Sequence, residues 1–114
     1  MSGLNSLAAE AHAIAVEKGW YERPRDVPEL IALCHSELSE ALECWRHLQD
    51  EIDLETPKTF DSEPKPVGFP IELADAIIRI VDMAAHLGVD LDAAVKVKMA
   101  YNRTRPHRHG GLRG

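Results

Sequence analysis

The chain has 114 residues, a formal net charge of -6 and 45% hydrophobic residues, so we expect a single domain over residues 1–114 with a modest core. No stretch approaches the roughly 20 apolar residues of a membrane span, and no basic segment leads into an apolar one at the N-terminus; we therefore expect a cytoplasmic protein that does not enter a membrane. The acidic balance argues against a general nucleic-acid surface.

Helical periodicity begins early in the chain. Residues 4–18 repeat apolar side chains at the spacing of one helix face, and Gly19 is a plausible end. A turn with two prolines follows, and Pro28 can be the first residue of a second helix that runs to about residue 48. The first half of the chain is therefore predicted to be two helices.

The second half is also predicted to be helical, after a long connection. Residues 49–68 are rich in acids and proline and carry no sustained period, which predicts a mobile loop. A third helix is predicted over 70–87, ended by Gly88, and a fourth over 91–104, capped by Asp90. We therefore expect an all-α fold.

Charge is distributed unevenly along the chain. All 19 acidic residues lie at or before Asp92, whereas the last nineteen residues contain six basic ones, Lys96, Lys98, Arg103, Arg105, Arg108 and Arg113. A basic tail at about 105–114 can be a solvated end. The alternative is that it helps to hold a small polyanionic ligand against the acidic body.

Two acids of the second helix stand out. Glu37 lies within the apolar arc of that helix, and Glu40 lies at its edge. The third helix repeats the spacing with Glu72 and Asp75. The two pairs can therefore converge four carboxylates on one spot.

The third helix also allows a plainer interpretation. Its polar residues share one strip of an otherwise apolar wheel. That strip can be the solvent side, with Asp75–Arg79 and Asp82–His86 as ordinary pairs four residues apart. The remaining apolar circumference is hard to cover with four helices, so we expect an oligomer, a dimer or tetramer.

A divalent cation explains four clustered acids better than burial alone. Neighbouring carboxylates raise one another's pKa, and an unpaired buried charge is costly. Oxygen-only ligands suit Mg²⁺, with Mn²⁺ as a possible substitute, rather than zinc. The candidate metal ligands are Glu37, Glu40, Glu72 and Asp75.

These motifs resemble a known family. "ELSE" (Glu37, Glu40), then "ELAD" (Glu72, Asp75), then Lys98 and Asn102 on a further helix, resemble the MazG-like nucleoside triphosphate pyrophosphohydrolases of the all-α NTP pyrophosphatase superfamily, over roughly residues 30–109. The resemblance implies a four-helix MazG-like bundle completed by oligomerisation, in which the four acids hold Mg²⁺. It also implies hydrolysis of a nucleoside triphosphate, a dNTP or non-canonical NTP, to the monophosphate and pyrophosphate.

The remaining site residues follow from chemistry and helix geometry. Glu37 and Glu40 are the candidate catalytic acids, and Glu40 is the one that can accept a proton from water. Trp20 can stack on a base or anchor the end of the first helix. The phosphates would be bound by one face of the fourth helix, formed by Lys98, Asn102 and Arg105.

Two other classes of protein collect acids on helices. A ferritin-type di-iron bundle uses Glu-x-x-His pairs, and none occurs here. A non-catalytic helical interaction or nucleotide-binding protein is the other alternative, and it predicts no metal-dependent turnover. Incubation with dNTPs and Mg²⁺ separates this alternative from an enzyme.

Overall fold

The structure is a computed structural model that describes residues 3–47, 51–55 and 65–106. The described residues form four helices and two short strands, in the order α1 (Leu4–Glu17), α2 (Val27–Arg46), β1 (Asp53–Glu55), β2 (Lys65–Val67), α3 (Phe69–Leu87) and α4 (Leu91–Thr104). The all-α prediction is confirmed. Within the described residues, the sequence analysis did not predict the antiparallel strand pair, which lies in the connection predicted over 49–68. The rest of that connection and most of the basic tail lie outside the described residues.

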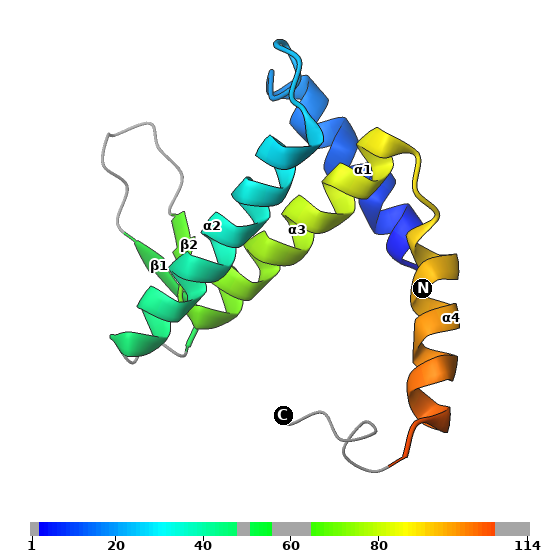
Figure 1. Ribbon diagram of the computed structural model, residues 1–114. Coiled ribbons are helices and arrows are strands. Elements are labelled where there is room, and N and C mark those ends of the chain that lie inside the picture. The colour runs from blue at the N-terminus through cyan, green and yellow to red at the C-terminus, as the bar shows by residue number, and fades with distance from the viewer. Residues whose placement is uncertain (1–2, 48–50, 56–64, 107–114) are drawn as a thin grey trace.

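Helices α2 and α3 form an antiparallel hairpin, and α1 crosses α3 near its C-terminal half (Figure 1). The core between them is built mainly from small side chains, which allow close approach of the helix backbones. Its buried apolar residues are Ala8, Leu30, Cys34, Ala41, Cys44, Ala76, Val81 and Ala84. Cys34 and Cys44 are both buried here, so they contribute to the packing of this hairpin.

Local sequence signals set the helix ends. The Asp26 carboxylate accepts a hydrogen bond from the Glu29 backbone N–H at 3.0 Å and caps α2. Helix α3 ends where Gly88 takes a left-handed conformation with φ 72°. These caps explain why sequence analysis placed the boundaries of both helices within a residue or two.

The beginnings of α1 and α4 cap each other. Asp92 accepts hydrogen bonds from the backbone N–H groups of Leu4 and Asn5, at 2.7 and 3.0 Å. The Asn5 side chain in turn accepts from the N–H of Leu91 at 2.9 Å and donates to Asp90 at 2.8 Å. With the Asp92 N–H, which donates to the same Asn5 oxygen at 3.2 Å, four backbone N–H groups of two distant segments are paired, and α4 is fixed at its N-terminal end.

The short strands lie close to the start of α3. Gly68 joins β2 to that helix with φ 121°, and a Cβ added there would lie 1.9 Å from the Glu51 carbonyl oxygen. A side chain cannot fit at this position without movement of the backbone. The strand pair is therefore held against the end of the α2–α3 hairpin that carries Glu72.

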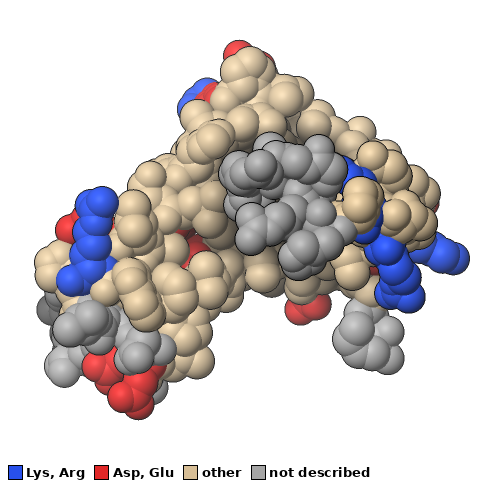
Figure 2. Space-filling view, turned by 60° about the horizontal axis from the view of Figure 1, so that its bottom comes forward, with Lys and Arg blue, Asp and Glu red and all other residues tan. Residues whose placement is uncertain are grey.

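Helix α4 extends away from the hairpin and contacts mainly α1 (Figure 1). No residue of α4 is buried, and its apolar side chains Val95, Val97, Met99 and Tyr101 are exposed. Figure 2 shows Lys and Arg side chains over α4, while much of the rest of that face is neither acidic nor basic. Among the residues described, no helix is long and apolar enough to span a membrane.

Candidate functional site

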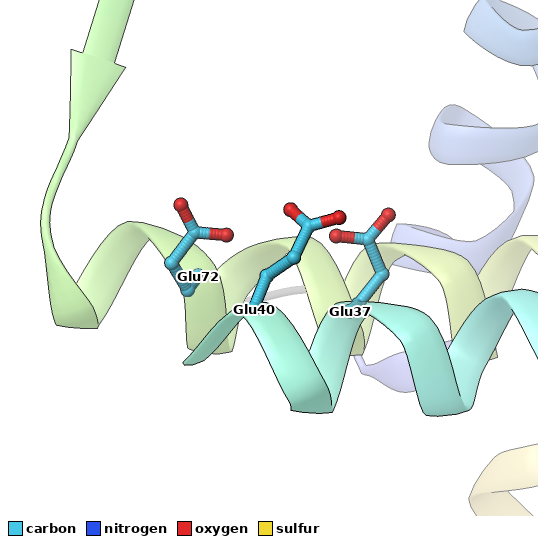
Figure 3. A group of neighbouring side chains, drawn as sticks. All are labelled: Glu37, Glu40 and Glu72. Atoms are coloured by element: carbon cyan, nitrogen blue, oxygen red, sulfur yellow. The ribbon is translucent and has the colours of Figure 1, made fainter. Parts of the chain in front are cut away.

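Three acids from two helices meet along the α2–α3 hairpin. One carboxylate oxygen from each of Glu37, Glu40 and Glu72 lies within 4.8 Å of one from each of the others. Figure 3 shows the three carboxylates side by side and directed to the same side of the helices. The antiparallel packing of α2 and α3 thus brings together three of the four candidate ligands. We call Glu37, Glu40 and Glu72 the acid cluster.

Glu72 carries the signature of a group that lacks its partner. Its Oε1 is buried, and no hydrogen-bond donor among the described residues reaches it. Burial, followed by the charges of Asp75, Glu40 and Glu37, raises the pKa of this carboxyl above its usual range. A buried acceptor without a donor is costly, so the site favours an added cation.

The geometry of the acid cluster fits a small divalent ion. Oxygens bound to one Mg²⁺ at its usual distance lie at most about 4.2 Å apart, and the three carboxylates are already within 4.8 Å. A small rotation of the side chains brings them into range. The oxygen-only donor set excludes no hard divalent ion but suits Mg²⁺ or Mn²⁺ better than zinc.

Asp75 lies next to the acid cluster without belonging to that closest group. It contributes to the raised pKa of Glu72 and lines the same cleft as Glu37 and Glu40. One helical turn separates it from Glu72. The structure therefore places Asp75 where a fourth carboxylate can assist.

Arg79 contacts the acid cluster rather than Asp75. Its Nε donates to Glu37 Oε2 at 3.4 Å, and its guanidinium carbon lies 3.8 Å from the centroid of the Trp20 ring. The guanidinium of Arg25 lies over the same ring at 4.0 Å. Trp20 is therefore engaged by two cations, which occupy space that a stacked base would need.

Two clefts flank the acid cluster, with Glu40 in both. The α1 cleft, of about 370 Å³, is lined by Ala11, Ile14, Ala15, Lys18, Trp20, Glu37, Glu40, Asp75, Ile78 and Arg79. The strand cleft, of about 310 Å³, is lined by Glu40, Glu43, Cys44, His47, Val67, Gly68 and Glu72. Both are within the size range of small-molecule sites, and only the α1 cleft combines apolar walls with Lys and Arg.

The three residues predicted to bind phosphates lie away from the acid cluster. Lys98 and Asn102 are exposed on α4, and α4 packs against α1 rather than the hairpin. Arg105 and Lys98 instead approach the Tyr101 ring, at 5.4 and 4.9 Å. The structure does not bring these three residues to the acid cluster of the same chain, so their role stays a prediction that requires another arrangement of α4 or a second subunit.

A second polar group was not foreseen from the sequence. Asp82 is only 2% exposed, accepts a hydrogen bond from Tyr21 Oη at 2.7 Å and pairs with His12 Nδ1 at 2.9 Å. The Tyr21 ring stacks on His86 at 4.1 Å. The C-terminal part of the polar strip of α3, with Asp82 and His86, therefore faces α1 and the turn after it. The sequence signal that could have revealed this group is the position of Asp82 between the apolar residues Val81 and Met83.

The chain has partial similarity to one characterised enzyme. Over 36 residues it is 47% identical to a dATP/dGTP diphosphohydrolase from Cyanophage S-2L, a match that covers 32% of this chain and 34% of that protein. The chain thus spans about a third of the length of this relative. No protein-family model and no solved structure matches this chain.

Proposed function

We propose that this protein is a metal-dependent nucleoside triphosphate pyrophosphohydrolase. The observation that carries the proposal is the acid cluster, in which Glu72 has a buried oxygen without a donor. The partial similarity to a diphosphohydrolase supports phosphoanhydride hydrolysis in general. The resemblance of the four acidic positions to MazG-like motifs points to cleavage between the α and β phosphates.

Glu37, Glu40, Glu72 and Asp75 are the residues that would hold Mg²⁺, with Mn²⁺ as a substitute. When bound, the ion would neutralise phosphate charge and make water more acidic. Glu40 is the most exposed of the acid cluster and borders both clefts. It is therefore the acid best placed to accept a proton from water, while Glu37 helps to orient it.

The reaction needs no nucleophilic side chain. Water attacks the α-phosphorus as its proton passes to Glu40, and the bond from that phosphorus to the α–β bridging oxygen breaks. The products are a nucleoside monophosphate and pyrophosphate. The name of the phage relative makes a purine dNTP the first substrate to try.

A homo-oligomer is part of the proposal. Apolar side chains are exposed on α2, α3 and α4, including Leu38, Trp45, Ile77 and Val97. Burying such rows against a second copy would be favourable, and it offers a route for a partner's basic α4 to approach the acids. Light scattering at micromolar concentration should give a dimer or tetramer mass.

The proposed activity is tested by product analysis. Purified protein is incubated with dATP, dGTP and other triphosphates in Mg²⁺ or in EDTA, and nucleotides and pyrophosphate are quantified. We expect equal amounts of monophosphate and pyrophosphate, only with the metal, and loss of turnover in Glu40→Gln. Glu10→Gln, the same change at an exposed position of α1, is the matched control. Binding of triphosphate without any turnover would instead support a non-catalytic nucleotide-binding protein.

A further inference from the structure

Arg79 is placed as a substrate-binding group rather than as half of a surface ion pair. It lines the α1 cleft together with Glu37, Glu40 and Asp75, and its side chain is 28% exposed. Resting on the function proposed above, we infer that the α1 cleft receives the phosphates of the substrate and that Arg79 binds one of them. This assigns a phosphate-binding role to a residue of α3 itself.

The hydrogen bonds of Arg79 leave most of its binding capacity unused. Its Nε donates one long bond of 3.4 Å to Glu37, near the limit of a useful hydrogen bond. Within the part of the chain that the structure describes, its two Nη groups donate to no acceptor. Those groups form the fork that binds phosphate in two-point geometry.

The surroundings of Arg79 hold the guanidinium in place. The Trp20 ring supports it at 3.8 Å, and Arg25 steadies the same indole at 4.0 Å. Arg25 is itself fixed, because its Nε donates to the Trp20 carbonyl at 2.7 Å and its Nη1 donates to Glu29 at 2.7 Å. A supported guanidinium loses little side-chain freedom on binding a ligand.

Charge explains why a cation is needed in this cleft. A triphosphate that approaches Glu37, Glu40 and Asp75 is repelled unless positive groups offset those acids. The basic residues that line the α1 cleft are Lys18 and Arg79. Of the two, Arg79 is the one that touches the acid cluster. Glu37 is also a proposed metal ligand, and its use there would release the Arg79 Nε in addition to the two Nη groups.

A phosphate-binding role and a merely structural role of Arg79 predict different effects on Mn²⁺ binding. Arg79→Gln removes a positive charge beside the acid cluster, so binding of Mn²⁺ alone should be unchanged or tighter. Binding of an α,β-methylene dATP analogue, measured by calorimetry in Mg²⁺, should weaken by about 10- to 100-fold, the loss expected for a hydrogen bond to a charged group. Arg79→Lys should recover part of this affinity. A merely structural role predicts that Mn²⁺ and nucleotide binding weaken together.

The matched control is Arg46→Gln, which makes the same charge change at an exposed position of α2 that lines neither cleft and should leave both affinities unchanged. Equal nucleotide affinity in wild type and Arg79→Gln would overturn the inference. Because the analogue cannot be cleaved at the α–β bond, binding is measured apart from chemistry. A wild type that binds it through Arg79 but never hydrolyses dATP would refute the proposed function alone. If wild type hydrolyses dATP but Arg79→Gln binds the analogue as tightly as wild type, the inference alone is refuted.

Discussion

Helix α3 carries two inward-facing acids whose surroundings differ. Asp82 has both oxygens engaged, by His12 at 2.9 Å and by Tyr21 at 2.7 Å. Glu72, nearly three turns earlier, has a buried oxygen that no donor reaches among the described residues. Burial and the charges of nearby acids raise its pKa and outweigh the opposing charge of Lys65. A carboxylate that the chain satisfies by itself stabilises the fold, whereas one left unsatisfied is kept at a cost that a ligand can remove. The two acids should therefore respond oppositely to substitution.

The largest effect is expected at the satisfied acid. Asp82→Ala leaves the Tyr21 hydroxyl and His12 without their buried acceptor, so the free energy of unfolding should fall by about 3 to 5 kcal/mol. Urea denaturation in EDTA measures it. If this variant is too unstable to purify, Asp82→Asn should show a smaller loss of the same sign. A variant as stable as wild type would show that this carboxylate does not hold α1 to α3.

At Asp75 the expected effect is on turnover rather than on stability, and it is smaller in energy. Asp75→Asn keeps the shape of the side chain and removes a charge beside the acid cluster, so turnover of dATP should fall on the order of 100-fold. The free energy of unfolding in EDTA should not fall. Steady-state kinetics and circular dichroism on the same sample check both statements. Full turnover would remove Asp75 from the active site.

Tyr21→Phe sharpens the contrast without removing a charge. It deletes one hydrogen bond to a buried carboxylate, which is expected to lower the free energy of unfolding by about 1.5 to 3 kcal/mol. The His12 contact to Asp82 remains. Thermal unfolding should show the same loss with and without Mg²⁺, since Tyr21 does not line either cleft. A loss that Mg²⁺ reverses would link the two regions, contrary to our account.

The smallest expected effect is a pH dependence at Glu72. Its pKa in the folded, metal-free protein is raised above the ordinary value of 4.5. As pH rises from below 4.5, the unfolded chain loses this proton first, so the group lowers stability increasingly until pH passes the raised folded-state value. Glu72→Gln should therefore gain stability over wild type across that window in EDTA. A difference that does not vary with pH would contradict this.

Sequence reasoning predicted the helices because periodicity and caps are local. Asp26, Gly88 and Asp90 act on residues within one turn of themselves, so their effect can be inferred without tertiary structure. The convergence of Glu37, Glu40 and Glu72 could also be predicted, since each lies on a largely apolar helix that had to pack. The two strands span three residues each, too few for a period to appear.

The partners of the polar strip could not be predicted from spacing. Arg79 and Asp82 have candidate partners four residues away, yet they contact Glu37 and Tyr21, which lie 42 and 61 residues away. For Asp82 burial decides this choice, because a buried carboxylate needs hydrogen-bond donors, whereas a solvent-exposed pair one turn along the helix contributes little to stability. The direction of α4 could not be predicted either, because it is also set by residues far apart in the sequence. It depends on mutual capping between Asn5 and Asp90, a contact that no local pattern specifies.

The most direct test of the metal site is thermal unfolding of wild type, Glu72→Gln and Tyr21→Phe, each in EDTA and in Mg²⁺. A ligand at 100 times its dissociation constant stabilises a fold by about 2.7 kcal/mol, so wild type should melt at a higher temperature in Mg²⁺. Glu72→Gln should melt no lower than wild type in EDTA and gain less from Mg²⁺, while Tyr21→Phe should melt lower but gain as much as wild type. A Glu72→Gln variant that melts lower in EDTA and gains the full Mg²⁺ shift would contradict the metal site and assign the acid cluster to structure.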